Sequence, residues 1–174
     1  MSIGESLLPE FDAEMASTRR LLERLPADRL EWRPHAKSRT LGELATHVTE
    51  TTRWGLRLEK DSFQVGSEKA PALTRTAEFL DRFDGNVAGS RAALARMSDE
   101  AMGRDFAVLK PDGEVFFHGK RKRLVRQVLL SHIIHHRGQL TVYLRLCDVS
   151  LPSVYGPTAD EAVVVTILDA EPGV

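Results

Sequence analysis

Two histidines four residues apart, His132 and His136, are the residues of this sequence best suited to chemistry. On an α-helix, side chains at positions i and i+4 lie on one face, about 5–6 Å apart at their Cβ atoms. Two imidazole rings at that separation can bind one metal ion through bonds of about 2.0–2.1 Å. The spacing therefore identifies a candidate metal site. The alternative is a pair of core histidines that hydrogen-bond to Glu side chains or backbone carbonyl groups.

The helix that carries the pair is expected to turn both rings toward the protein core. An amphipathic helix places its apolar residues in one stripe, and both histidines fall in the middle of that stripe. Polar rings facing a core need partners, because burying an unpaired polar group costs about 2–7 kcal/mol. The apolar residues of the stripe are Val125, Val128, Leu129, Leu140, Tyr143 and Cys147.

His47 is the third candidate ligand, because it lies at the edge of the apolar stripe of another predicted helix, over residues 40–60. In helix bundles, metal sites are built from side chains that project inward from facing helices. His47, His132 and His136 would provide three nitrogen ligands. A three-histidine set leaves a fourth position open for water or substrate, as in catalytic zinc sites.

The immediate neighbours of His136 are expected to serve other roles. His135 is turned about 100° around the helix from His136, so we expect it to contact a neighbouring helix rather than a metal. Arg137 is expected to form a salt bridge or a subunit contact. Gly138 has no side chain and would let another helix approach closely.

Three residues on the helical faces of the histidines are expected to support the site. Ligating histidines usually donate their second ring N–H to an acceptor, and this bond sets the tautomer. Gln139 lies one turn after His136 and is placed to hydrogen-bond a ligand ring or a bound water molecule. Trp54 and Tyr143 are expected to pack in the core or to border a pocket.

Polar residues on the helix of His47 are further candidates for contacts with its ring. Glu43 precedes His47 by one turn, and Glu50 or Thr51 follows it at a reachable distance. Glu43 also completes the segment Thr40-Leu-Gly-Glu43, which is typical of a capping box at a helix start. Helix capping is therefore the role that we favour for Glu43.

Four amphipathic helices are expected to position these residues. A short β-hairpin is predicted over residues 104–118, around a Pro-Asp-Gly turn, and it should pack on the helices or cover one end of them. Residues 148–174 are expected to be mostly irregular, with a short strand over 162–167. The pattern predicts an all-α fold, a four-helix bundle in a single domain over residues 1–174. The predicted helices cover residues 3–25, 40–60, 74–97 and 120–147.

The composition argues against several classes of protein. The formal net charge of −1 does not provide the strongly basic face that nucleic-acid binding requires. The single cysteine, Cys147, excludes an intrachain disulfide and is expected to act as a small buried apolar residue. The N-terminus lacks signal-peptide features, and no apolar run approaches the length of a membrane span. We therefore expect a cytoplasmic protein that binds neither nucleic acid nor membranes.

Two segments, Leu41-Gly-Glu-Leu-Ala-Thr-His47 and His132-Ile-Ile-His-His136-Arg-Gly-Gln139, resemble the signature sequences of the DinB superfamily. The resemblance extends over nearly the whole chain. It implies a four-helix bundle with up-down-down-up topology, usually assembled as a homodimer. It also implies one divalent transition metal ion, commonly zinc or nickel, bound by His47, His132 and His136.

The resemblance also implies a class of reaction. Some DinB-like relatives transfer or isomerise substrates with low-molecular-weight thiols such as mycothiol or bacillithiol. The leading hypothesis is therefore a metal-dependent thiol S-transferase that acts on a small molecule. The alternatives are a non-catalytic, stress-associated protein that binds a metal or ligand, and a metal-dependent hydrolase. A hydrolase needs a general base, and no carboxylate is securely placed on the face of the histidines.

Two apolar residues of the last predicted helix bear on the oligomeric state. Leu130 and Ile134 lie off the apolar stripe that contains the histidines. Together they would form an exposed apolar patch, which we expect another helix or a second subunit to bury.

Overall fold

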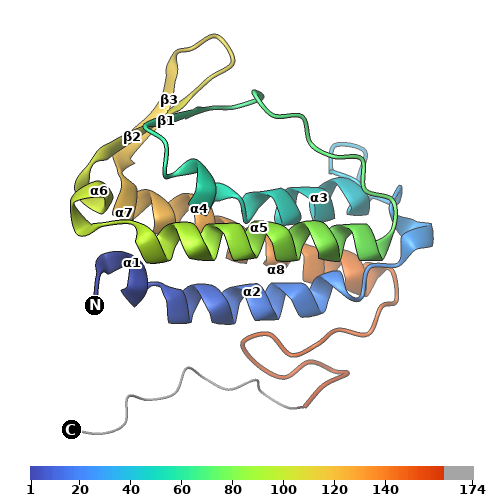
Figure 1. The fold of residues 1–174 in the computed structure, drawn as a ribbon. Coiled ribbons are helices and arrows are strands. Elements are labelled where there is room, and N and C mark those ends of the chain that lie inside the picture. The colour runs from blue at the N-terminus through green and yellow to red at the C-terminus, as the bar shows by residue number, and fades with distance from the viewer. Residues whose placement is uncertain (163–174) are drawn as a thin grey trace, which may run out of the picture.

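The computed structural model of the chain describes residues 1–162. Its four longest helices lie side by side, with a small sheet at one end (Figure 1). Each of the four contacts two of the others: α2 packs on α5 and α8, and α3 packs on the same two helices. The protein is therefore mostly helical, as predicted. The four helices are α2 (Leu8–Leu22), α3 (Leu41–Thr51), α5 (Thr76–Arg96) and α8 (Ser131–Leu146).

Shorter helices extend or join these four. Three of the predicted long helices are consequently segmented, whereas the third one, α5, is continuous. The short elements are α1 (Ile3–Ser6), the 3₁₀ turn η1 (Ala27–Arg29), α4 (Trp54–Arg57), α6 (Asp99–Gly103), α7 (Arg121–Leu124) and the π-helix η2 (Val125–Leu130).

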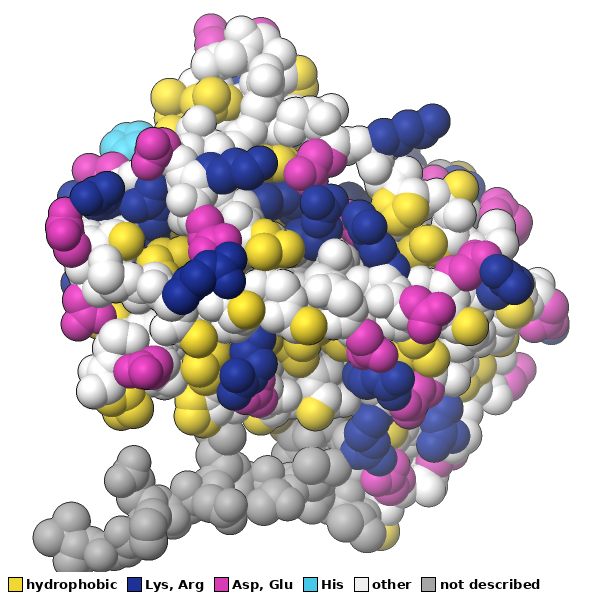
Figure 2. All heavy atoms as spheres, viewed as in Figure 1, with side chains coloured by type: hydrophobic (Ala, Val, Ile, Leu, Met, Phe, Trp, Pro, Cys, Tyr) yellow, Lys and Arg dark blue, Asp and Glu magenta, His cyan; other side chains and the backbone are white. Residues whose placement is uncertain are grey.

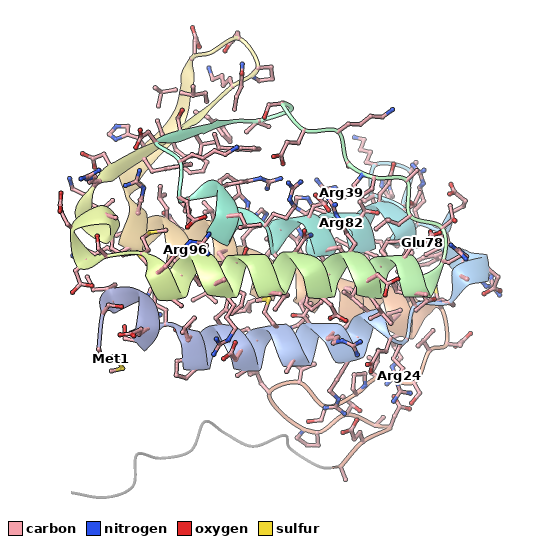
Figure 3. All side chains as sticks on the ribbon, in the orientation of Figure 1. Met1, Arg24, Arg39, Glu78, Arg82 and Arg96 are labelled. Atoms are coloured by element: carbon pink, nitrogen blue, oxygen red, sulfur yellow. The ribbon has the colours of Figure 1, made fainter. Side chains whose placement is uncertain are left out.

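Side-chain caps define where two of the long helices begin. Thr40 accepts a hydrogen bond from the backbone N–H of Glu43, whose carboxylate accepts one from the backbone N–H of Thr40. This capping box confirms the predicted start of α3 and satisfies two backbone donors at the helix end. At the start of α5 the Glu78 carboxylate accepts from the backbone N–H groups of Thr74 and Arg75 (Figure 3).

The predicted helix over residues 40–60 is interrupted after Thr51. The hydroxyl groups of Thr51 and Thr52 donate to the backbone carbonyls of His47 and Thr49, at 2.8 and 2.6 Å. Such bonds compete with the regular backbone pattern of a helix. The short helix α4 then packs on α5 through Gly55, where an added Cβ atom would lie 2.5 Å from the Cβ of Ser90.

The sheet contains the predicted hairpin and one strand that was not predicted. Strands β2 (Asp105–Leu109) and β3 (Val115–Lys120) pair antiparallel, and Gly113 in their turn has a φ of 89°. Strand β1 (Ser62–Gln64) pairs parallel to β2 and completes the order β1-β2-β3. A strand of three residues is too short for an alternating pattern, so its place in the sheet depends on tertiary packing.

The π-helix η2 changes which residues of the last long helix face the core. A π-turn contains an extra residue, which rotates the following side chains relative to a regular α-helix. As a result, Tyr143 and Cys147 are only partly buried, and the histidines lie at the edge of the buried stripe rather than in its middle. The buried residues here are Val125, Val128, Leu129, Leu130, Ile133, Arg137, Leu140 and Leu144.

Because of the same rotation, Leu130 and Ile134 are covered within this chain, so they no longer indicate a dimer. Leu130 is 1% exposed, and Ile134 packs against the core of the same chain. Gly138 also departs from expectation, because nothing lies within 4 Å of the position that its Cβ would occupy. It therefore does not mark a close helix contact within the described part of the chain.

The described part of the C-terminal segment is irregular, as expected, and is held to the helices by ion pairs. Glu161 pairs with Arg20 of α2, and Asp160 pairs with Arg145 of α8. The strand expected over 162–167 lies, apart from its first residue, outside the described residues.

The surface carries charges of both signs. Figure 2 shows basic and acidic side chains interspersed over the visible face, in keeping with the formal net charge of −1. Within residues 1–162, no helix combines the length and the apolar character that crossing a membrane requires.

Candidate metal centre

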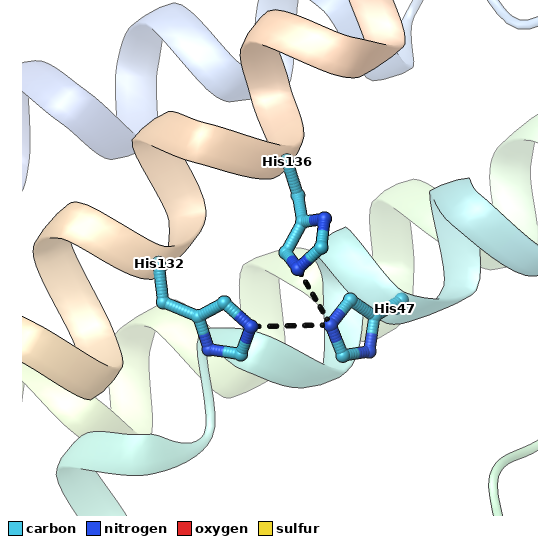
Figure 4. A group of neighbouring side chains, drawn as sticks. All are labelled: His47, His132 and His136. Carbon is cyan, nitrogen blue, oxygen red and sulfur yellow. Dashed lines mark hydrogen bonds between the residues drawn. The ribbon is translucent and has the colours of Figure 1, made fainter.

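The three predicted ligands converge where α3 packs on α8. His47 projects from α3, and His132 and His136 project from successive turns of α8 (Figure 4). The Nε2 atom of His47 lies 3.0 Å from Nε2 of His136 and 3.3 Å from Nε2 of His132. No two of the three candidate ligand atoms are more than 4.8 Å apart, and all three side chains are half-buried.

These distances fit a single metal ion. Donor atoms bound tetrahedrally at about 2.0–2.1 Å from one ion lie about 3.3 Å apart. The distances of 3.0 and 3.3 Å from His47 agree with that value. Three imidazole nitrogens are also a donor set that suits divalent transition metals. The cluster could therefore hold such an ion.

Hydrogen bonds on the far side of two rings orient their nitrogen lone pairs toward the common centre. Nδ1 of His136 lies 2.7 Å from Oε1 of Gln139, and Nδ1 of His132 lies 3.4 Å from the carbonyl oxygen of Val128. Both partners are acceptors, so each Nδ1 carries the hydrogen and donates it. A neutral ring with its hydrogen on Nδ1 has a free lone pair on Nε2. Both rings are thus in the tautomer that leaves Nε2 free to bind a metal ion.

Burial and a nearby positive charge also keep the three histidine rings neutral. Burial is the main reason that the pKa of His47 is lowered to about 3, and the positive charge of Arg39 acts in the same direction. Burial likewise lowers the pKa of His132 and the pKa of His136, and Arg39 contributes to both. Only neutral imidazole binds a metal ion, so the site is deprotonated and ready to bind at neutral pH.

The other residues that sequence reasoning placed near the site have different positions. Gln139 hydrogen-bonds a cluster histidine, and Trp54 is buried in the wall of a cavity beside the cluster. The ring of Tyr143 packs edge-to-face on Trp32, and its hydroxyl donates to the backbone carbonyl of Arg39. Glu43 is engaged in the cap of α3 rather than with the ring of His47.

The two residues on either side of His136 have different surroundings. His135 does not belong to the cluster, and the expectation that it contacts a neighbouring helix is wrong, because its side chain is exposed. The helix turn directs it away from the packed core and toward a cavity that its ring helps to line. Arg137 is 1% exposed and forms the predicted salt bridge, at 2.6 Å to Glu14 of α2.

A cavity of about 1020 Å³ adjoins the cluster on the side of the sheet. His47, His132 and His135 form part of its wall, and most of the rest is apolar. A volume of this size can hold a small-molecule substrate. The principal apolar residues are Trp54, Phe63, Val108, Phe116, Phe117 and Leu124.

A second hollow, of about 750 Å³, reaches the cluster from the other end of α3. His47 and Glu50 border both spaces. Its wall is more polar and carries both signs of charge, with Arg33 and Arg39 beside Asp28, Glu31 and Glu43. His47 therefore lies between a mainly apolar cavity and a more polar one.

The network of charged side chains around Glu50 was not predicted from the sequence. Arg82 donates to the Glu50 carboxylate at 2.8 Å, and Arg53 pairs with both Glu50 and Glu68. Burial opposes ionisation, but the hydrogen bonds and charges of Arg82 and Arg53 lower the pKa of Glu50. These residues come from separate segments, so no local sequence pattern links them.

The family model of the DinB family matches residues 1–167. The chain belongs to the DinB family. Among its relatives, the uncharacterized protein YrdA of Bacillus subtilis strain 168 is 24% identical over 161 residues, which is 90% of each chain. The resemblance that the two histidine segments suggested is confirmed.

Solved DinB-like structures share the fold. The crystal structure of YjoA, a DinB-like protein of Bacillus subtilis, superposes with a TM-score of 0.65 at 18% identity, over 84% of this chain and 96% of that one. A DinB-like protein of Bacillus cereus ATCC 10987 gives a TM-score of 0.66 at 22% identity, over 87% and 97% of the two chains. At this level of identity the similarity concerns the fold alone.

Proposed function

We propose that this DinB-family protein binds one divalent transition metal ion, zinc or nickel, through His47, His132 and His136. The observation that carries the proposal is the convergence of three Nε2 atoms, at 3.0 and 3.3 Å from that of His47. The lowered pKa values of the three rings and the two Nδ1–H donors support it. Gln139 then acts by orienting the ring of His136.

We further propose that the protein is a metal-dependent thiol S-transferase. In such a transfer the thiol loses its proton, its sulfur bonds to an electrophilic carbon, and the leaving group departs with the electron pair of the broken bond. A bound divalent metal supplies a lowered pKa for a coordinating thiol. The two hollows that meet at His47 support a reaction with two substrates.

The hydrolase alternative is less well supported. A metal-dependent hydrolase needs a general base beside the reacting water. Glu50 is the carboxylate that borders both hollows, but it is engaged by Arg82 and Arg53, and its pKa is lowered. A carboxylate held in that state is a weak base. A non-catalytic metal-binding or ligand-binding protein is the alternative that experiment must separate from the transferase.

The proposal also covers the domain organisation, the helix topology and the oligomeric state. We propose a single domain over residues 1–174, an up-down-down-up bundle and a cytoplasmic homodimer. The pairwise packing of α2, α3, α5 and α8 supports the bundle. Val142 and Leu146 support the dimer, because these apolar residues, one turn apart on α8, are 57% and 56% exposed. Sedimentation of the purified protein at several concentrations tests the dimer, and a monomer throughout would contradict it.

Metal analysis of matched variants tests the metal site. Protein dialysed against zinc and then against buffer should retain about one ion per chain, and His136→Ala should lose most of it. His135→Ala is the matched control, because His135 is adjacent in sequence but lies outside the cluster, and it should retain the ion. Equal metal content in wild type and His136→Ala would contradict the site.

Activity is tested separately from metal binding. Zinc-loaded or nickel-loaded protein should conjugate bacillithiol, mycothiol or glutathione to members of a panel of electrophiles. Absence of conjugation across the panel by fully loaded protein would contradict the transferase and favour the non-catalytic alternative.

A further inference from the structure

The cavity on the sheet side of the histidines combines aromatic walls with the buried cation of Arg57 and the carboxylates of Glu50 and Glu68, each of which is paired with arginine. Trp54 comes from α4, Phe63 from β1, and Phe116 and Phe117 from β3, so three separate segments supply its aromatic rings. Flat apolar surfaces of this kind bind aromatic ligands by edge-to-face and offset-stacked contacts. The walls alone therefore favour a ligand that contains an aromatic ring.

Arg57 is the cation in this wall. Its side chain is only 12% exposed, and the guanidinium lies 4.4 Å from the ring centre of Phe63 and 5.2 Å from that of Trp54. Its Nη2 group donates to the Glu68 carboxylate at 2.8 Å. Within residues 1–162, no acceptor bonds its Nη1 group. The aromatic contacts hold the guanidinium in place, and one amino group remains free to donate to a ligand.

The local charge balance favours an anionic ligand. Three guanidinium groups, of Arg53, Arg57 and Arg82, share the two carboxylates of Glu50 and Glu68. One positive charge is therefore left uncompensated beside the cavity. A carboxylate in the cavity would neutralise it and form charge-assisted hydrogen bonds with Arg57.

We infer that this cavity binds a small aromatic carboxylate, with the ring between the aromatic side chains and the carboxylate at Nη1 of Arg57. The volume of about 1020 Å³ accommodates a ligand of one or two rings and still leaves the histidines accessible. That this ligand is the acceptor of the thiol rests on the proposed function. Its binding by the aromatic walls and Arg57 does not depend on a metal.

Calorimetric titration of metal-free protein with naphthoate and with its neutral analogue naphthylmethanol tests this inference. Wild type should bind naphthoate about tenfold more tightly than naphthylmethanol, because only naphthoate forms a charge-assisted hydrogen bond. Arg57→Met should bind the two probes equally. Arg96→Met is the matched control, because Arg96 pairs with Glu59 away from the cavity, and it should keep the tenfold preference.

A second variant keeps the test decisive if Arg57→Met does not fold. Phe116 is 61% exposed, so Phe116→Ala should leave the fold intact and weaken the binding of both probes by a similar factor. Equal affinity of wild type for the two probes, or a preference that survives in Arg57→Met, would overturn the inference. So would naphthoate binding that appears only after metal is added, since the carboxylate would then bind the ion. Failure of metal retention alone would leave this inference standing.

Discussion

Oε1 of Gln139 lies 2.7 Å from Nδ1 of His136 and accepts its hydrogen, which leaves the Nε2 lone pair facing His47. Gln139 and His136 are three residues apart on one helix face, so α8 itself supplies both the candidate ligand and the group that sets its tautomer. The hydrogen bond between Gln139 and His136 therefore directs the Nε2 lone pair of His136 toward the centre of the histidine cluster.

Gln139→Leu should therefore weaken zinc binding by about 10–100-fold, the usual effect of removing a hydrogen-bond partner of a metal ligand. Gln139→Glu keeps an acceptor at the same place and should bind zinc at least as tightly as wild type. Competition with a chelator of known affinity measures both variants. If the Leu variant binds like wild type, Gln139 does not position His136.

The pH dependence of zinc affinity follows from the lowered histidine pKa values. Burial lowers the pKa of His47 to about 3 and also lowers those of His132 and His136. A lowered pKa means that protons compete with the metal only at more acidic pH, so the affinity should change little between pH 7.5 and 6.5 and fall at lower pH.

Three histidines with ordinary pKa values near 6.5 would behave differently. Each would be half protonated at pH 6.5, and the affinity would fall about sixfold between pH 7.5 and 6.5. Zinc affinities measured at pH 7.5, 6.5 and 5.5, corrected for the titration of the chelator, distinguish the two cases. A loss of about sixfold between pH 7.5 and 6.5 would show that burial does not lower the three pKa values.

Two glycine substitutions should change stability in opposite directions. In Gly55→Ala, the new Cβ would meet the Cβ of Ser90 at 2.5 Å, so α4 and α5 would have to separate. Overpacking of this kind costs about 1–3 kcal/mol. Gly85 lies on α5 with nothing within 4 Å of its Cβ position, so Gly85→Ala should raise the free energy of unfolding by up to about 1 kcal/mol.

Urea denaturation of the two glycine variants measures these changes. The same substitution in the same part of the fold is compared, so the difference reports the contact with Ser90. A Gly55→Ala variant as stable as Gly85→Ala would show that α4 does not pack on α5 as closely as described.

Local sequence patterns were sufficient for much of the fold and for two members of the histidine cluster. The capping box at Thr40 and Glu43 predicted the start of α3, and the Pro-Asp-Gly turn predicted the β2-β3 hairpin. The spacing of His132 and His136 predicted that their rings share a helix face. All of these depend on interactions within a few residues, which the sequence displays directly.

Periodicity failed where the backbone departs from the regular α-helix. The π-helix over Val125–Leu130 rotates the buried stripe, so Leu130 is covered by the chain itself and Tyr143 lies at the edge of the core. A regular period of 3.6 residues does not include the extra residue of a π-turn.

By itself, the amino-acid sequence determined the family, the predominance of helices and the three histidines that meet at one point. Only the tertiary structure decided what surrounds that point. It set the tautomers of two rings, the lowered histidine pKa values, and the placement of Arg57 against Trp54 and Phe63. The physical reason is the separation along the sequence of the residues that interact. Helix faces and turns arise from neighbouring residues, whereas burial, charge balance and cavity walls arise only when α3, α4, α8 and the sheet come together.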